Sequence, residues 1–290
     1  MLDSHVHFWD PRNLSYPWLS EVPVLNRPFT PEILLGEYSA PIQAIFVEAG
    51  AATHHAGAEI EGVRQAARRH PWIRGAVAHV PLEDTLRAQA AIRWHGADPF
   101  VVGVRRNLQD EAPGFIADAA LRRGVIALGE ADLPFDVCVR EHQIPEVVEL
   151  ADACPQTTII LDHLGKPRSP RPADATTWRA SLRRLAKRDN VVCKLSGLAT
   201  ELPVGSGRAV SLSVLREALD CFGPARCLYG SDWPVMSLTT DYQAWLDLVR
   251  EALSHYPAPD AHAVLYANAA RVYRVEPALP CPAPTEGKPA

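Results

Sequence analysis

Short apolar, β-branched runs recur along this 290-residue chain, and longer segments with one apolar face and one charged face lie between them. Such runs are typical of buried strands, and the intervening pattern is typical of amphipathic helices. The predicted strands span residues 2–7, 43–49, 73–80, 101–107, 135–139, 158–163, 191–198 and 227–232. The predicted helices span residues 58–69, 85–94, 115–128, 143–153, 177–187, 212–222, 241–253 and 262–273.

Eight strand–helix units in a chain of this length predict an α/β fold, a single closed (β/α)8 TIM barrel over residues 1–275. The alternative is an open doubly wound sheet, but no Gly-x-Gly-x-x-Gly follows a strand to support its dinucleotide-binding form. The connection from Trp9 to about Pro31 is long and rich in proline and aromatic residues, so we expect a lid or part of a pocket wall there. Residues 276–290 are proline-rich and are expected to form a disordered tail.

Composition and charge narrow the class of protein. A net charge of −5 argues against nucleic acid as a partner, because nucleic acid requires a basic face. No apolar run is long enough to span a membrane, and no charged and apolar leader precedes Asp3. The six cysteines include no Cys-x-x-Cys pair, and we expect reduced thiols in a cytoplasmic protein. The sequence leaves open whether the chain forms a homo-oligomer.

The first predicted strand carries the most suggestive side chains. Residues two apart on a strand share a face, so His5 and His7 present two imidazoles side by side, with Asp3 on the same face. A His-x-His pair of this kind is a frequent metal-binding or acid/base arrangement. Asp232 ends the last predicted strand. In a closed barrel these two strands are neighbours, and the pair and the acid are therefore expected to share one site.

Polar side chains gather at the carboxyl ends of the other strands, where active sites of such barrels lie. They are Glu48, His79, Arg105, Arg106, Asn107, Asp162, His163, Lys194 and Trp233. Arg105 and Arg106 have opposite parity, so only one of them can point inward; we favour Arg105, because Val101 and Gly103 share its face. Structural alternatives remain: Glu48 as the partner of an interior cation, Lys194 paired with Glu48, and Arg106 at the barrel rim.

Seven segments, read together, carry a family resemblance over nearly the whole chain. They are DSHVHFWD at 3–10, GVRRNL at 103–108, PFDVCV at 134–139, LDHLGKP at 161–167, KLSGL at 194–198, YGSDWP at 229–234 and NAARVY at 268–273. In this order they resemble the amidohydrolase superfamily, in its amidohydrolase-2 branch. More narrowly, the chain is similar to the sugar-lactonase group that contains L-fuconolactonases and L-rhamnonolactonases.

The resemblance implies roles for particular residues. The polar centre would be His5, His7, His163 and Asp232, with Asp232 as the base and Arg105 as a substrate ligand. The same four residues are the candidate metal ligands. Substrate-binding candidates are Glu48, His79, Arg106, Asn107, Lys194 and Trp233.

Two departures from the superfamily pattern bear on metal and substrate. Many members bridge two metals with a modified lysine on the fourth strand and add a histidine ligand from the fifth. At these positions this chain has Arg105 and the segment with Phe135, Asp136 and Cys138. A fixed guanidinium also disfavours a concentrated positive charge nearby. We therefore expect at most one zinc-like divalent ion, and some similar enzymes need none. His79 stands where relatives usually carry tryptophan, which leaves the lactone unidentified.

The predicted function is a hydrolase that opens a sugar lactone to its aldonate with water activated by Asp232. The alternative is a carboxy-lyase or another metal-dependent hydrolase of the same branch, because fold does not determine chemistry. A non-catalytic binding protein on the same barrel would be expected to lack Asp232 or the histidine pair. A serine hydrolase is disfavoured because no Gly-x-Ser-x-Gly occurs.

Overall fold

The computed structural model describes residues 1–38, 42–168, 176–203 and 205–276, and in this part eight parallel strands form one barrel. The strands are β1 (Leu2–Val6), β2 (Gln43–Val47), β3 (Ile73–His79), β4 (Val101–Asn107), β5 (Phe135–Cys138), β6 (Ile159–Leu161), β7 (Val191–Leu195) and β8 (Cys227–Tyr229). Each strand pairs with the next along the chain. The barrel closes where Val6 bridges Trp233, with the amide of His7 donating to the Trp233 carbonyl at 2.8 Å. The predicted TIM barrel is confirmed.

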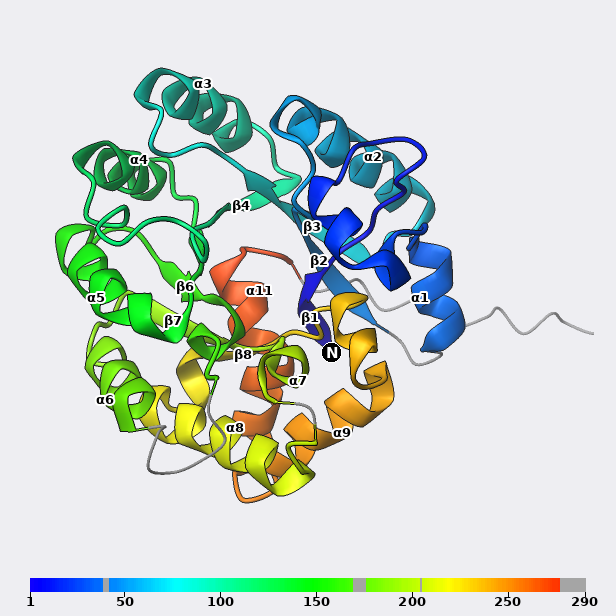
Figure 1. The fold of residues 1–290 in the computed structure, drawn as a ribbon, viewed down its shortest axis with the longest axis vertical. Helices are drawn as coiled ribbons and strands as arrows, with labels where there is room; N and C mark the ends of the chain where they lie inside the picture. Colours follow the sequence, from blue (N-terminus) through cyan, green and yellow to red (C-terminus); the bar gives the residue numbers. More distant parts are fainter. Residues whose placement is uncertain (39–41, 169–175, 204, 277–290) are drawn as a thin grey trace, which may run out of the picture.

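Helices surround the strands, as Figure 1 shows in a view down the barrel. They are α1 (Pro31–Glu37), α2 (Ala56–Arg69), α3 (Thr85–Gly96), α4 (Ala119–Glu130), α5 (Ile144–Ala153), α6 (Thr176–Leu185), α7 (Leu198–Glu201), α8 (Arg208–Phe222), α9 (Tyr242–Ala252), α10 (Ala258–His262) and α11 (Asn268–Val272). The short helices α1, α7 and α10 were not predicted, except for His262 at the end of α10, since each is too brief to show a helical period. A π-helical turn, Ala263–Ala267, joins α10 to α11 within the predicted closing helix.

Two of the differences from the predicted boundaries have clear local causes. The predicted helix from residue 115 begins at Ala119, because the Asp118 side chain accepts hydrogen bonds from the amides of Ala120 and Leu121 and caps it there. Strand β6 stops at Leu161, and the next residues turn, with φ of 52° at His163. The polar residues at this point therefore belong to a turn rather than to a strand.

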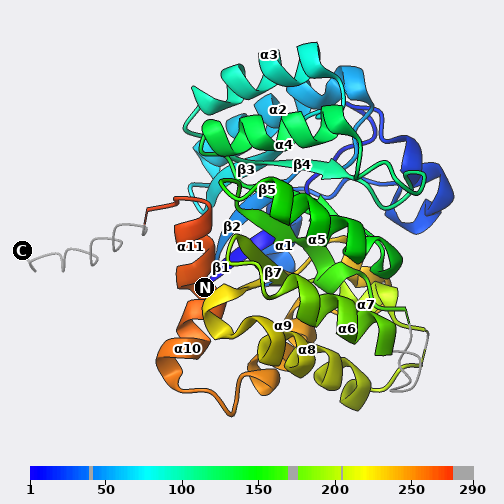
Figure 2. The same ribbon diagram turned by 90° about the vertical axis from the view of Figure 1, so that its left-hand side faces the viewer.

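Two apolar layers hold the barrel. One fills its interior with a side chain from nearly every strand: Leu2, Ile45, Val47, Val77, Val102, Ile160, Val192 and Leu228. Helix α11 packs against this layer at the N-terminal ends of the strands and closes that end, as Figure 2 shows from the side. The second layer lies between the outer faces of the strands and the surrounding helices. With one end filled, a ligand can enter only from the C-terminal ends.

The remaining expectations concern the tail, the cysteines and membranes. Residues 277–290 of the expected disordered tail, with Cys281, lie outside the described residues. The other cysteines, Cys138, Cys154, Cys193, Cys221 and Cys227, are free thiols. None of the helices in the described part of the chain combines the length and the apolar character that crossing a bilayer requires.

Candidate active site

A bulge in β1 decides which of its side chains enter the barrel. The register with β2 shifts between Asp3 and Val6, so Leu2 faces the interior and Asp3 does not. The Asp3 carboxylate accepts hydrogen bonds from the amide of Ser231 at 2.9 Å and from the hydroxyl of Tyr242 on α9 at 2.8 Å. The expectation that Asp3 shares a face with the histidine pair is therefore wrong, because a bulge reverses the strand alternation.

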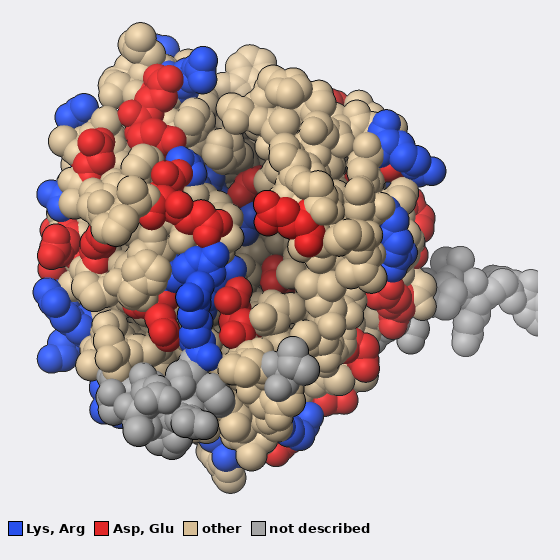
Figure 3. Space-filling view, viewed as in Figure 1, with Lys and Arg blue, Asp and Glu red and all other residues tan. Residues whose placement is uncertain are grey.

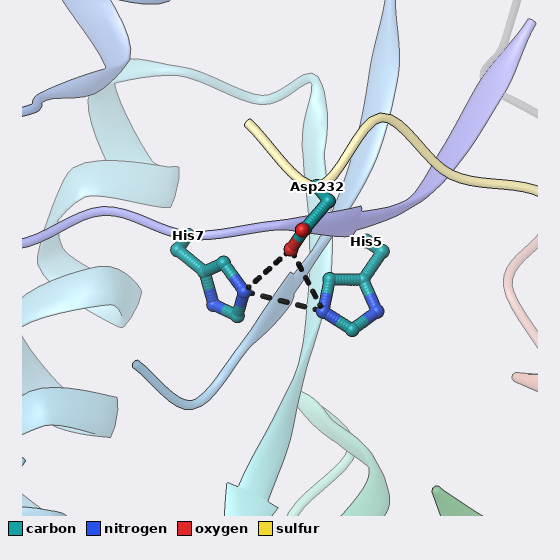
Figure 4. Close-up of side chains that lie close together, drawn as sticks. All are labelled: His5, His7 and Asp232. Atoms are coloured by element: carbon teal, nitrogen blue, oxygen red, sulfur yellow. Dashed lines mark hydrogen bonds and ion pairs between the residues drawn. The ribbon is translucent and has the colours of Figure 1, made fainter. Parts of the chain in front are cut away.

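His5, His7 and Asp232 converge at the C-terminal end of the barrel (Figure 4). The two Nε2 atoms lie 3.2 Å apart. One Asp232 carboxylate oxygen lies 3.3 Å from Nε2 of His7 and 3.7 Å from Nε2 of His5. His5 lies on β1 and His7 follows its last residue, Val6; Asp232 follows β8 with a left-handed φ of 64°. The neighbouring first and last strands thus build one cluster, as the sequence predicts.

His163 reaches the same region from the turn after β6. Its ring centroid lies 4.7 Å from that of His5, and its Nδ1 lies 3.0 Å from the Ser196 hydroxyl. Burial, and then the proximity of His5, lower the pKa of His163 well below its usual value. Gly197 permits this approach, since a Cβ there would lie 2.3 Å from the His163 Nδ1, and its φ of 62° also favours glycine.

Arg105 points into the barrel, as predicted. The argument from shared parity holds only in part: Gly103 faces the interior, where it approaches Tyr273, but Val101 packs in the outer layer. Its Nε donates to the Glu48 carboxylate at 2.6 Å and its Nη2 to the Glu48 carbonyl at 2.6 Å. Burial alone would raise the pKa of Glu48, but Arg105, followed by His79, lowers it below its usual value. Glu48 is thus the partner of an interior cation, the structural alternative considered above.

Lys194 lies fully buried beneath His5. Its ammonium contacts Asp136 at 2.5 Å, Asp162 at 3.2 Å and Nδ1 of His5 at 3.2 Å. The Tyr273 hydroxyl donates to Asp136 at 2.9 Å. Burial raises the pKa of Asp136 to about 6 despite the opposing effect of Lys194. Lys194 therefore pairs with Asp136 and Asp162, and the alternative pairing with Glu48 does not occur.

A cavity of about 870 Å³ opens above this cluster at the C-terminal ends of the strands. Figure 3 shows the hollow at the centre of this face, with basic and acidic side chains around it. The long first connection forms part of the wall through Pro17, Trp18, Glu21 and Val22. Of the expected site residues, all of which the structure describes, His7, Arg105, Asn107, His163 and Asp232 line the cavity.

The other expected site residues lie behind or beside this wall. His5, Glu48 and Lys194 are buried directly behind it. Arg106 pairs at the rim with Glu83 at 2.8 Å and Glu111 at 2.5 Å, and His79 lines a neighbouring cavity of about 530 Å³. Trp233 is buried among aromatic rings, and its indole nitrogen donates to Glu37 at 2.7 Å.

Sequence reasoning missed several residues of the cavity wall, among them Lys166, Arg140 and Trp18. Lys166 contacts Glu201 at 2.7 Å, and Arg140 contacts Asp110 at 2.6 Å. Trp18 is held by a 2.8 Å hydrogen bond from its indole nitrogen to the Ala49 carbonyl. Lys166 and Arg140 closely follow the ends of the sixth and fifth strands, a position that already signals a site in this fold.

Among the residues that the structure describes, two groups of side chains could hold a metal ion. His5, His7 and Asp232 form one group, and His5, Asp162 and His163 form the other. Zinc bonds of about 2.0–2.1 Å in a tetrahedron place ligand atoms about 3.3 Å apart, close to the separations of 3.2, 3.3 and 3.7 Å in the first group. The first group therefore fits a zinc-like ion, and the structure places His163 in the second group instead.

Comparison with known proteins supports the TIM-barrel fold and the family that the sequence motifs indicate. The family model described as amidohydrolase matches residues 2–275. The chain is 38% identical to an L-fucono-1,5-lactonase of Burkholderia multivorans over 97% of both chains, and 31% identical to one of Burkholderia ambifaria over 95% and 96%.

Among solved structures, an amidohydrolase from Burkholderia multivorans crystallised with bound zinc superposes with a TM-score of 0.84. It shares 34% identity, over 95% of this chain and 99% of that one. The chain belongs to the amidohydrolase family.

Proposed function

We propose that this protein is a hydrolase that opens a sugar lactone, of the L-fuconolactone type, to the aldonate. The observation that carries the proposal is the Asp232 carboxylate in the wall of a polar cavity, flanked by imidazole and guanidinium donors. The near full-length similarity to two proteins named L-fucono-1,5-lactonase supports the substrate class. A lactone is an activated cyclic ester, and its opening needs a base, an oxyanion site and a proton for the leaving alkoxide.

Asp232 is the base in this mechanism. It lines the cavity, and its carboxylate lies 3.3 Å from Nε2 of His7. A water held between Asp232 and the lactone carbonyl would lose its proton to the carboxylate as it attacks. Protonated Asp232 then returns that proton to the ring oxygen as the carbon–oxygen bond breaks.

Arg105 and His163 supply the donors for the developing oxyanion. Arg105 uses Nε and Nη2 on Glu48, which leaves Nη1 directed toward the cluster, 3.5 Å from Nε2 of His5. His163 contacts Ser196 through Nδ1, so Nε2 is available to the cavity. Loss of one preorganised donor of this kind costs about 10²–10³-fold in turnover.

Lys166 and Arg140 bind substrate hydroxyls and the carboxylate of the product. Both line the cavity and are already paired with one carboxylate each, which holds their side chains in place. The product carboxylate would therefore bind to two cationic side chains that are already held in position.

A zinc-like ion at His5, His7 and Asp232 would polarise the lactone carbonyl and acidify a bound water. Arg105 opposes such an ion, because its Nη1 lies only 3.5 Å from a ligand nitrogen. We propose at most one equivalent of divalent metal per chain, with lactonase activity remaining after chelation. Elemental analysis, with rates before and after chelation, tests both statements. Two tightly held equivalents, or complete loss of activity that metal restores, would overturn them.

The function is tested by a panel of sugar lactones with a pH indicator. Ring opening releases a proton, whereas the carboxy-lyase alternative releases carbon dioxide. Asp232→Asn should lower turnover by about 10²–10⁴-fold with an unchanged circular dichroism spectrum, because the amide cannot accept the proton of water. Asp247→Asn, an exposed carboxylate on α9, is the matched control. Wild-type rates in the Asp232→Asn variant would remove this residue from the mechanism.

A further inference from the structure

The hydrogen bonds around the histidine pair form a connected series in which each group donates to the next. The donor and acceptor at one end of this series are fixed by the Val47 carbonyl. Nδ1 of His7 lies 2.8 Å from that oxygen, which can only accept, so Nδ1 carries the proton. When His7 is neutral, its Nε2 is then a bare acceptor, with Nε2 of His5 at 3.2 Å and the Asp232 carboxylate, also an acceptor, at 3.3 Å. A hydrogen bond between these two nitrogens therefore requires the proton of His5 on Nε2.

Lys194, at the other end of this hydrogen-bond series, also favours a proton on Nε2 of His5. The Lys194 ammonium has three N–H donors and three acceptors around it: Asp136 at 2.5 Å, Asp162 at 3.2 Å and Nδ1 of His5 at 3.2 Å. With the proton of His5 on Nδ1, one buried N–H of Lys194 would face another N–H. Burying an unsatisfied donor is costly, so this arrangement is disfavoured.

The reverse assignment has weaker contacts. It would need Nδ1 of His5 to donate to Asp162 at 3.5 Å and Nε2 to accept from Arg105 at 3.5 Å. Both distances are at the limit for a hydrogen bond, whereas the two contacts of the first assignment are 3.2 Å. The first assignment also places two donors against each other, Nε2–H of His5 and Nη1 of Arg105, but at the longer distance of 3.5 Å.

We infer that Lys194 holds His5 as the Nε2–H tautomer and thereby weakens metal binding at His5, His7 and Asp232. A metal ion needs the lone pair of Nε2, so the proton would have to sit on Nδ1, facing the ammonium. Histidines that bind metals usually donate their other N–H to a carbonyl or carboxylate. His7 follows this rule through Val47, whereas Nδ1 of His5 lies nearer to the Lys194 ammonium, at 3.2 Å, than to the Asp162 carboxylate, at 3.5 Å. Lys194 is a positioning residue in this scheme, and the inference concerns the free protein whatever its substrate.

The tautomer can be measured directly in the wild-type protein. Nitrogen NMR of chelator-treated protein labelled with ¹⁵N-histidine distinguishes Nδ1–H from Nε2–H, and a His5→Gln sample assigns the signal. We expect the Nε2–H form of His5 in the free protein and a change to Nδ1–H when zinc is added. A free protein with the proton on Nδ1, or with both nitrogens protonated, overturns the inference.

Zinc affinity provides the second test, by calorimetry on chelator-treated protein. The double variant Asp136→Asn/Lys194→Met removes one negative and one positive charge, so the net charge of the site is unchanged. The carbonyl oxygen of the new amide can still accept from Tyr273, and Asp162 becomes the partner for an Nδ1–H. Zinc should bind at least about tenfold more tightly, as expected for loss of a charge-assisted hydrogen bond that opposes binding.

Lys166→Met/Glu201→Gln is the matched control, since it removes another ion pair at the same cavity, also without changing the net charge, and Lys166 makes no contact with His5. Its effect on zinc affinity should be smaller than that of the Asp136→Asn/Lys194→Met variant. Equal effects would mean that the loss of any ion pair at the cavity, not the tautomer of His5, changes metal binding, and an unchanged affinity in the Asp136→Asn/Lys194→Met variant would also refute the inference. If that variant does not fold, the wild-type NMR result alone decides.

Discussion

Arg105 and Arg106, which are neighbours on β4, point to opposite sides of the barrel wall. Arg105 enters the barrel, where it donates two hydrogen bonds to Glu48, whereas Arg106 stays at the rim with Glu83 and Glu111. A rigid fork that binds both a carboxylate and a carbonyl cannot be reproduced by a single ammonium. The identity of the side chain therefore matters more at the inward position than at the outward one.

Arg105→Lys should lower kcat/KM by about 10–100-fold, because the lost contacts include a charge-assisted hydrogen bond that also orients the guanidinium. Arg106→Lys is the control with the same chemical change one residue away, and its effect should be small. Steady-state kinetics on the lactone identified by the panel measure both. A larger loss in the Arg106 variant would contradict the assignment of Arg105 to the site.

At the scale of elements, β2 and α2 meet at a pair of buried carboxyl groups. Glu59 on α2 accepts a hydrogen bond from the amide of Ala49 at 3.1 Å, next to the end of β2. Burial, followed by the proximity of Glu48, raises the pKa of Glu59 to about 8. The connection after β2 forms part of the cavity wall, so this carboxyl group supports the site from behind.

The raised pKa has a consequence for stability. Between pH of about 4.5 and 8 the folded protein keeps the Glu59 proton and the unfolded chain loses it, so this group lowers stability as pH rises through that range. Glu59→Gln should therefore gain Tm relative to wild type from pH 5 to pH 8, and the gain should then level off. Thermal melts across this range measure the effect, with exposed Glu61→Gln as control. A Tm difference independent of pH would show that Glu59 is ionised in the folded protein.

At the scale of the whole molecule, α11 and the residue that follows it close the end of the barrel where β1 begins. Tyr273 follows α11, packs in the interior layer with Leu2 of β1, and donates to Asp136 of β5. One residue thus links the closing helix, the barrel interior and the buried polar network under the site.

Tyr273→Ala should lower the free energy of unfolding by about 3–5 kcal/mol, as for other large aromatic side chains removed from a core. Tyr273→Phe keeps the packing and removes only the hydroxyl, and should cost about 1–3 kcal/mol. Urea denaturation followed by tryptophan fluorescence measures both. Equal losses in the two variants would assign the whole effect to the hydrogen bond with Asp136.

The sequence by itself determined the order of strands and helices, the inward position of Arg105 and the meeting of the histidine pair with Asp232. These features follow from short periodicities and from the geometry of a parallel barrel, which brings the carboxyl ends of all strands together. Only the tertiary structure decided that Asp3 turns outward, that Lys194 pairs with Asp136 and Asp162, and that Arg140 and Lys166 line the cavity. A bulge and a choice of buried partner depend on register and packing between segments far apart in the chain, which local sequence does not encode.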